Sequence, residues 1–260
     1  MAVNAKLTLL LAAVILPITA GRIDWRGITP KVKSQVRTLH IADAQALLSS
    51  FCKDSVKPIA GIGLTCATSR PGPRFSDLVG DRFHPEGVIF GHFTGPVSDD
   101  AAVSGWSFES HPELWGGTLL LTRRDGKWMP LWYKSAVITE SCRAVTMPSG
   151  REVLLCEAED GGMGHQFHYL FSVDLTRPAD IRKTLLVTAD SYESPCAIHQ
   201  QQLQLVDWAP ESRHLSVTLR TPQWRRISPE PCIGDPMDEK RPPLRSVLEF
   251  DLTDRGFLPR

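Results

Sequence analysis

Four short apolar runs, separated by turn-forming residues, fill the stretch from residue 87 to residue 133. They cover residues 87–93, 100–106, 116–124 and 127–134, and each has the length and the apolar content of a strand. The sharpest turn is Asp125-Gly126, a dipeptide that favours the positive backbone angles of a type I′ hairpin turn. We therefore predict one antiparallel four-stranded unit with a tight hairpin at this dipeptide.

Two further groups of apolar runs follow along the chain. The second group comprises residues 142–147, 151–158, 165–174 and 181–188. In its third run the period-two rule of strands predicts one core face, made by His165, Phe167, Tyr169, Phe171 and Val173. The third group comprises residues 203–208, 214–220 and 246–252.

Three connections lack a strand pattern. Residues 221–245 carry six prolines and Cys232, and we predict a long loop stapled by that cysteine because proline cannot donate to a strand ladder. Residues 68–85, with three prolines and several charges, are predicted to be a surface connection. Residues 159–164 read Glu-Asp-Gly-Gly-Met-Gly and are predicted to be a hairpin loop. A phosphate-binding loop is disfavoured there because a strand pattern, not a helix, follows it.

One segment has the composition of a helix. Residues 41–51 contain good helix formers with apolar positions at roughly helical spacing, so a short helix is predicted. The mixed, basic residues 21–40 before it are expected to form an arm or one strand.

Repeated four-stranded units of about 45–50 residues are typical of propeller blades. The predicted fold is therefore all-β, with antiparallel four-stranded units in a propeller-like domain over residues 87–260, preceded by an arm, helix and loop over residues 21–86. Propellers usually need about four blades, and the sequence offers two clear units and one broken unit. An open, incomplete array and a two-sheet β-sandwich are the alternatives. In an open array the remaining edges must be covered by the arm, by the proline-rich loop or by another copy of the chain.

The residue sequence of the first unit resembles an FG-GAP repeat of the integrin-alpha N-terminal propeller type. In that family a Gly-x-Phe strand end leads to Asp-x-Ala-Val, and a Gly-Gly opens the next strand. Here residues 91–93, 100–103 and 116–118 read Gly-His-Phe, Asp-Ala-Ala-Val and Gly-Gly-Thr. The resemblance implies propeller architecture. The calcium loop of the family would fall near residues 94–99, which read Thr-Gly-Pro-Val-Ser-Asp, so no metal is carried over.

The first twenty residues have the pattern of a secretory signal peptide. A single positive charge at Lys6 precedes an apolar run over residues 7–16, and small residues end at Ala20. The run is shorter than the ~20 residues that a spanning helix needs. We predict cleavage after Ala20, no membrane span in the product, and a secreted or periplasmic location.

The charge balance argues against two classes of partner. Once Lys6 is removed with the signal, 28 basic residues face 29 acidic residues, a net charge of −1. Such a chain has no electrostatic reason to bind nucleic acid or an anionic membrane. An unidentified protein or a carbohydrate is the expected ligand, and no cofactor is predicted.

The six cysteines predict disulfides, because an exported chain with an even number is expected to oxidise them. Cys142 and Cys156 flank the three-residue turn 148–150 symmetrically, so they lie directly opposite each other in a hairpin. The Cα separation of about 4.5–5.5 Å across such a pair suits a disulfide. Pairing between neighbours then gives Cys52–Cys66 and Cys196–Cys232. A zinc site is disfavoured because no two cysteines are two to four residues apart.

Two short segments are candidate binding residues. His92, Asp99 and Asp100 lie on the loop where a propeller would bind a ligand, although such residues are also routine in turns. Trp224 and Arg225 are the best candidates for an exposed anchor in the proline-rich loop, because Trp and Arg are enriched at interface hot spots.

Tryptophans suggest a sugar-binding hypothesis, since flat aromatic rings stack on pyranose rings. Trp106, Trp115, Trp128 and Trp132 cluster in the first unit, and strand parity predicts that the last two share a face. Core packing is the more common reason for such a cluster.

The sequence contains no complete catalytic constellation. No Gly-x-Ser-x-Gly elbow occurs, and His165 and His168 point to opposite faces of a strand, so they cannot share a metal ion. The leading hypothesis is a binding or structural module without catalysis. The competing hypothesis is a secreted hydrolase or lyase whose catalytic groups converge from distant loops. The competing hypothesis would be favoured if the following residues converged in one pocket: His92, Asp99, Asp160, His165 and Glu193.

Overall fold

The computed structural model describes residues 31–69, 72–78, 80–107, 116–135, 137, 141–162, 165–177, 181–191, 201–225 and 238–260. Within these ranges the chain forms antiparallel strands, one α-helix and one 3-10 turn. The all-β prediction with a single short helix is therefore confirmed. Among the described residues, no helix combines the length and hydrophobicity that a membrane crossing requires.

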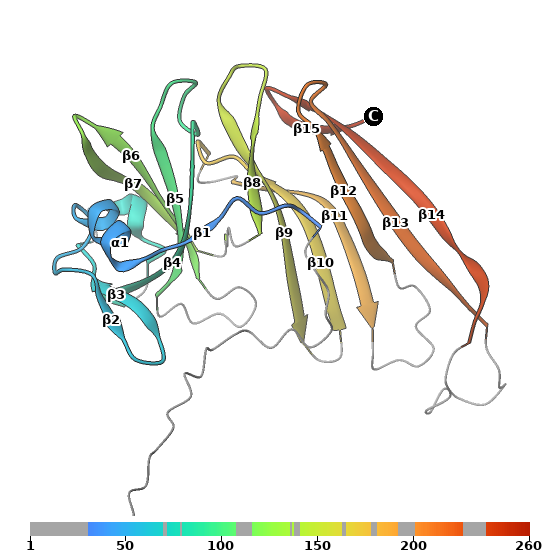
Figure 1. Ribbon diagram of the computed structural model, residues 1–260, viewed down its shortest axis with the longest axis horizontal. Helices are drawn as coiled ribbons and strands as arrows, with labels where there is room; N and C mark the ends of the chain where they lie inside the picture. The colour runs from blue at the N-terminus through green and yellow to red at the C-terminus, as the bar shows by residue number, and fades with distance from the viewer. Residues whose placement is uncertain are drawn as a thin grey trace, which may run out of the picture.

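The first sheet is curled and carries the N-terminal elements (Figure 1). Its strands run in the order β2-β3-β4-β5-β6-β7, with β1 paired to β4. They are β1 (Arg37–Thr38), β2 (Lys57–Ile59), β3 (Gly63–Ala67), β4 (Arg82–Gly91), β5 (Asp100–Trp106), β6 (Gly117–Arg124) and β7 (Lys127–Ser135). The helix α1 (Ile41–Leu48) and the 3-10 turn η1 (Pro73–Phe75) belong to the same region. The strands β4 to β7 confirm the predicted four-stranded unit.

The predicted hairpin turn is also confirmed. Asp125 and Gly126 both have positive φ angles, 50° and 77°, and the strands on either side pair from Arg124 and Lys127 outward. Two successive positive φ angles define the type I′ turn, whose twist matches that of the strands.

The second and third sheets are meanders in which every strand pairs with the next one in the chain. The second consists of β8 (Cys142–Thr146), β9 (Glu152–Gly162), β10 (His165–Val173) and β11 (Arg182–Ser191). The third consists of β12 (Gln202–Ala209), β13 (His214–Arg225), β14 (Asp238–Thr253) and β15 (Gly256–Pro259). The strand β15 was not predicted from the sequence.

The first and second sheets pack face to face through one shared core. Ile89, Leu120 and Trp132 of the first sheet are buried in the same cluster as Leu154 and Phe171 of the second. The predicted core face of β10 is confirmed here for Phe171 and Val173, and Tyr169 packs against the same cluster.

The opposite face of the second sheet packs against the third. Leu155 and Leu170 are buried with Leu215, Val217 and Phe250. Because successive residues of a strand point to opposite faces, Leu154 and Leu155 contribute to different cores and the second sheet is buried on both sides.

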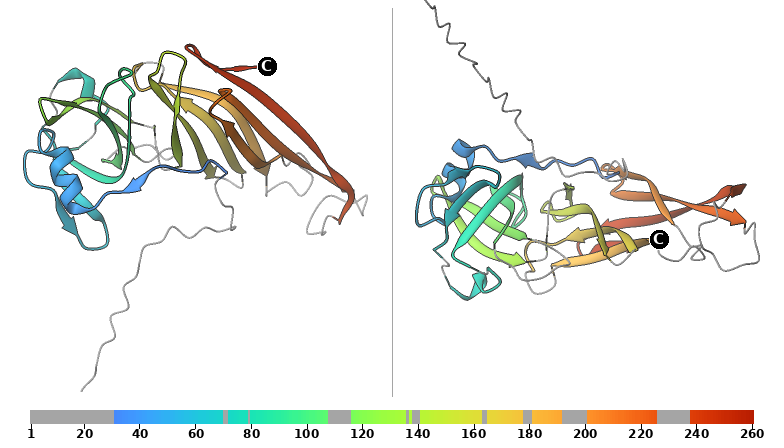
Figure 2. Two further views of the ribbon diagram at one scale, coloured as in Figure 1. Left: turned by 45° about the horizontal axis from the view of Figure 1, so that its top comes forward. Right: turned by 90° about the horizontal axis from the view of Figure 1, so that it is seen from below.

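The result is an open series of sheets, stacked as blades are in a propeller. Figures 1 and 2 show the first sheet at one end of the long axis and the third at the other. Within the first sheet, α1 covers the remaining face, where Leu47, Leu48 and Phe51 pack with Phe83 and Leu119.

Both disulfides that fall within the described residues are confirmed. Cys142 and Cys156 are paired across β8 and β9 with a Cα separation of 4.1 Å, and Cys52 is bonded to Cys66. The pair Cys196–Cys232 lies outside the described residues, as does the predicted signal peptide over residues 1–20.

Two predicted loops are wrong because strands extend into them. The connection 68–85 contains the start of β4 at Arg82, and Phe75 and Leu78 are buried in the core under α1. Likewise, residues 159–162 of the predicted loop 159–164 belong to β9, which continues to Gly162.

The proline-rich segment 221–245 is a second correction, since β13 continues to Arg225 and β14 begins at Asp238. The ladder accommodates the prolines by breaking its register. Thr221 pairs with Leu244 and Gln223 with Arg241, which leaves Pro222 and the Pro242-Pro243 pair unmatched between them. Prolines at such irregularities do not have to donate a ladder hydrogen bond.

The parity prediction for Trp128 and Trp132 is also wrong. The register of β6 and β7 shifts between Leu120 and Leu121, so that Leu131 is an extra residue in β7. A one-residue bulge reverses the facing of everything beyond it. Trp128 therefore packs against the α1 side of the sheet, whereas Trp132 is buried between the first and second sheets.

Candidate functional site

The loop between β4 and β5, where the sequence suggested binding residues, is held together by its own side chains. The carboxylate of Asp100 is fully buried and accepts hydrogen bonds from the Thr94 backbone N–H at 2.6 Å and from the Ser98 hydroxyl at 2.6 Å. A buried carboxylate with this many donors is the usual means of fixing a tight loop.

His92 and Asp99 are similarly engaged at the surface of this loop. The backbone N–H of His92 donates to Glu152 at 2.7 Å, and its imidazole Nδ1 contacts the carbonyl oxygen of Ser98. Asp99 forms an exposed ion pair with Arg123 at 3.4 Å. These contacts give each side chain a structural role, and ligand binding by them stays a prediction.

The residues of the competing hydrolase hypothesis lie at two ends of the second sheet. Glu152, at the start of β9, donates its backbone N–H to the His92 carbonyl at 2.8 Å. Asp160 lies eight residues further along β9, and His165 begins β10 beside Gly162. At ~3.3 Å per residue, His92 and Asp160 are on the order of 26 Å apart along the strand. Glu193 lies outside the described residues.

The other candidates are packed or only partly described. Trp224 and Arg225 belong to the end of β13, and the structure describes their backbone alone. Trp106 stacks on His84 with ring centroids 3.9 Å apart, and Trp132 donates its Nε1–H to the Leu175 carbonyl at 3.2 Å. Trp115 lies outside the described residues.

A cleft of about 640 Å³ opens between the second and third sheets, beyond the end of their shared apolar core. The core face of β9 passes from Val153 and Leu155 to the charged Glu157, and that of β10 passes from Leu170 to His168. Period-two alternation therefore places two polar side chains where the apolar contact between the sheets ends.

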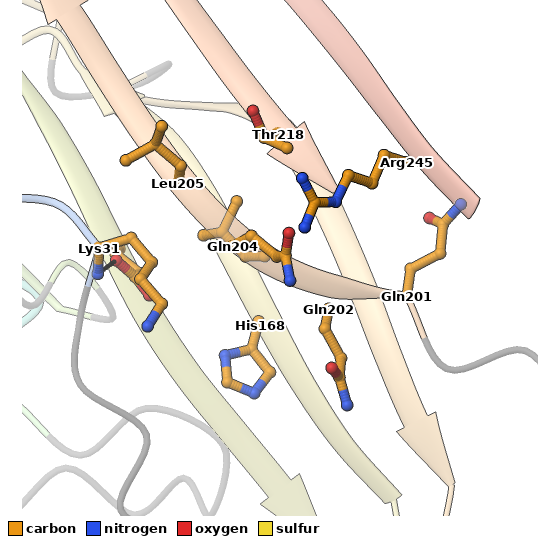
Figure 3. Close-up of a pocket in the computed structure, with 10 residues that line it drawn as sticks. Lys31, His168, Gln201, Gln202, Gln204, Leu205, Thr218 and Arg245 are labelled. Atoms are coloured by element: carbon orange, nitrogen blue, oxygen red, sulfur yellow. Dashed lines mark hydrogen bonds between the residues drawn. The ribbon is translucent and has the colours of Figure 1, made fainter. Parts of the chain in front are cut away.

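The lining of the cleft combines cationic groups with amides, contributed by the N-terminal arm, the second sheet and the third. It includes Lys31, Glu157, His168, Gln202, Gln204 and Arg245. In the view of Figure 3 the imidazole of His168 lies between Lys31 and Gln202, and the guanidinium of Arg245 is directed toward Gln204. Such groups suit a polar ligand that presents hydrogen-bond acceptors.

Glu157 is the buried acid of this cleft. Its carboxylate accepts hydrogen bonds from the backbone N–H groups of Lys31 at 2.6 Å and Val32 at 2.9 Å, and the residue is 6% exposed. Burial raises the pKa of Glu157 above its usual value of 4.5, although these two N–H groups oppose the rise. The residue therefore fixes the N-terminal arm to the second sheet and defines one end of the cleft.

Two substitutions of Glu157 are expected to distinguish the contribution of its hydrogen bonds to stability from the contribution of its charge. Glu157→Ala leaves two buried N–H groups unpaired and should lower the free energy of unfolding by about 2–3 kcal/mol. Glu157→Gln keeps an acceptor oxygen and removes the buried charge. A raised native pKa contributes stability below the unfolded pKa, and this is lost as pH rises through the native pKa. The free energy of unfolding of Glu157→Gln should therefore equal that of wild type near pH 4 and exceed it at pH 7–8, as measured by denaturant unfolding.

The cleft residues were missed because they come from segments far apart in the sequence. One local signal was present, since Glu157 interrupts the apolar face of β9 set by Val153 and Leu155. A charged residue at a core position of a strand is unusual unless it has partners, and it marks a functional or anchoring position. Nothing comparable marks Gln204 or Arg245.

No family model matches this chain, and neither a curated protein nor a solved structure gives a match. The resemblance of the first unit to an FG-GAP repeat accordingly stays a prediction. Within the part of the chain that the structure describes, no group of three or more histidine, cysteine, aspartate or glutamate side chains could hold a metal ion.

Proposed function

We propose that this protein is an exported binding module, acting without catalysis, that holds an acidic oligosaccharide in the cleft between its second and third sheets. The observation that carries the proposal is the lining of that cleft, where the cationic side chains of Lys31 and Arg245 and the imidazole of His168 lie on one concave surface together with glutamine amides. The two disulfides support export, because such bonds persist in oxidising compartments.

The chemistry of the lining favours an acidic carbohydrate over other ligands. Lysine and arginine side chains bind carboxylates by charge-assisted hydrogen bonds, and glutamine amides donate to and accept from sugar hydroxyls. The one buried acid of the cleft, Glu157, already accepts two backbone hydrogen bonds, so part of its charge is compensated by the protein. A concave site with a few convergent polar groups is the usual form of a small-ligand site.

The arrangement of acidic groups supports the absence of catalysis. Glycoside hydrolysis uses two carboxyl groups about 5–10 Å apart across the scissile bond. Glu157 is tied to the N-terminal arm, while Asp99 and Asp100 belong to the β4–β5 loop at the other end of β9. Glu159, which contacts His168 at 3.5 Å, belongs to the same strand as Glu157, and the third sheet contributes no carboxyl group to the described lining of the cleft.

Binding should depend on the cationic residues of the cleft. Isothermal titration calorimetry with acidic and neutral oligosaccharides of equal length is expected to show binding of the acidic set alone, weakened by salt. Lys31→Gln should weaken it by about tenfold, the effect of removing one charged hydrogen bond. His168→Gln should weaken it by a smaller factor, because the imidazole is replaced by another polar group. Lys53→Gln, an exposed lysine outside the cleft, is the matched control.

Two results would overturn the proposal. One is binding of acidic oligosaccharides that neither Lys31→Gln nor His168→Gln changes. The other is turnover of a glycoside, ester or peptide that a single polar substitution abolishes, because a module without catalysis has no turnover to lose.

A further inference from the structure

The outer face of the third sheet, which points away from the core shared with the second sheet, carries exposed side chains on β12 and β14. Strand parity separates its two sides: Leu215, Val217 and Leu219 of β13 point into the core shared with the second sheet. Ser216, Thr218 and Arg220, between them, therefore point outward. By contrast, α1 covers the first sheet, and the second sheet is buried on both faces.

Exposed apolar side chains form a row across the middle of this outer face. The register pairs Leu205 of β12 with Thr218 of β13, and Thr218 with Val247 of β14. Leu205 and Val247 are each 54% exposed. A second surface laid on this row would remove the apolar area of both side chains from water.

Charges of opposite sign flank this apolar row symmetrically. Two residues along the strands in one direction, the register aligns Gln202, Arg220 and Arg245. Two residues along in the other direction, it aligns Asp207, Ser216 and Glu249. The face therefore has a basic end, an apolar centre and an acidic end, spaced equally.

We propose that a second copy of this chain docks face to face on the outer face of the third sheet, related by a two-fold axis that runs along the apolar row. Rotation about that axis reverses the strand direction and leaves each strand above its counterpart. Val247 then meets Val247 of the second copy, and Leu205 meets Leu205 of the second copy. Arg245 lies opposite Glu249 of the second copy, and Glu249 lies opposite Arg245 of the second copy.

The symmetry of the charges is what identifies the occupant as the chain itself. An isologous interface must be self-complementary, and it makes every unlike contact twice. The face meets this condition because the basic and acidic rows are equidistant from the apolar row. Within its own chain the Glu249 carboxylate lies 3.8 Å from Nε2 of His214, which is a long contact. The charge of Glu249 therefore remains available to a second copy.

The proposed dimer interface and the proposed ligand site overlap in part. Leu205, Thr218 and Arg245 lie at the rim that the cleft shares with this face, whereas Val247 and Glu249 do not line the cleft. Loss of dimerisation in Glu249→Arg with retained oligosaccharide binding would separate the two interactions.

Sedimentation equilibrium of the full mature chain tests the dimer. Wild type is expected to dimerise, and Arg245→Glu or Glu249→Arg should each raise the dissociation constant by about 100-fold, since each places like charges together at two symmetric contacts worth about tenfold each. The exchange variant R245E/E249R restores opposite charges at both contacts and should dimerise again. An equimolar mixture of the two single variants should form a heterodimer for the same reason.

The control and the contradicting outcomes follow from the same geometry. Arg255→Glu changes charge equally in the β14–β15 turn, outside this face, and should leave the dissociation constant unchanged. Thermal unfolding of each variant shows that it is folded. A monomeric wild type, or an exchange variant that dissociates as readily as the single variants, would overturn the proposed interface.

Discussion

Removal of the Cys142–Cys156 disulfide by a double alanine substitution is expected to lower the free energy of unfolding by about 3 kcal/mol. The bond closes a loop with a sequence separation of 14, and loops of about 15 residues restrict the unfolded chain by roughly that amount. Both cysteines are fully buried in the core between the first and second sheets, so the void left by their sulfurs adds to the loss. Denaturant unfolding followed by tryptophan fluorescence measures it.

The second disulfide is a matched control for this effect. Cys52–Cys66 has the same sequence separation of 14, but Cys52 is only partly buried at the edge of the α1 core. Removal of Cys52–Cys66 should lower the free energy of unfolding by a similar loop-closure contribution and by a smaller packing contribution. If both double variants unfold at the same denaturant concentration as wild type, neither disulfide constrains the unfolded chain and the stapled architecture is wrong.

The parts of the fold that the sequence predicted are those governed by local chemistry. Asp125-Gly126 specifies its turn because few residues adopt two consecutive positive φ angles. The Cys142–Cys156 pair was predictable because a short turn fixes the register of a hairpin, and register decides which residues lie opposite each other. Both features depend on no more than about fifteen consecutive residues.

The parts that were missed depend on irregularities or on distant contacts. The extra residue Leu131 reverses the facing of Trp132, and the only local sign of that bulge is Pro130 beside it, which is equally compatible with an edge strand. The prolines of segment 221–245 suggested a loop, yet they sit where the ladder of β13 and β14 breaks its register. The cleft brings Lys31 to His168 and Arg245, and strand periodicity cannot say which sheet packs on which.

The stacking of the sheets is the one feature on which the cleft, the disulfide core and the exposed outer face all depend. Strand order within each meander follows the order of the strands in the chain, but the contact between meanders comes from side chains on both partners. A substitution that removes a side chain from such a contact therefore tests the architecture more directly than a change within one sheet.

Phe171→Ala is expected to lower the free energy of unfolding by about 4 kcal/mol. Phe171 is 2% exposed and belongs to the core that joins the second sheet to Ile89, Leu120 and Trp132 of the first. Truncation of a buried phenylalanine loses its transfer free energy and leaves a cavity that the two sheets cannot fill, at about 3–5 kcal/mol. The guanidinium carbon of Arg182 also lies 4.2 Å from the ring centroid, and this cation–π contact would be lost.

Phe90→Ala removes the same number of atoms from an exposed phenylalanine and provides the comparison. Phe90 is 41% exposed on β4 and contacts the ring of Trp128 at a centroid distance of 6.0 Å. Its truncation should cost about 1 kcal/mol, because a large part of its surface is already in water and no enclosed cavity is left behind. Equal losses for the two variants in chemical denaturation would mean that the first and second sheets do not share a core. If only Phe171→Ala lowers the free energy of unfolding substantially, the result supports the conclusion that the first and second sheets stabilise each other through their packed faces.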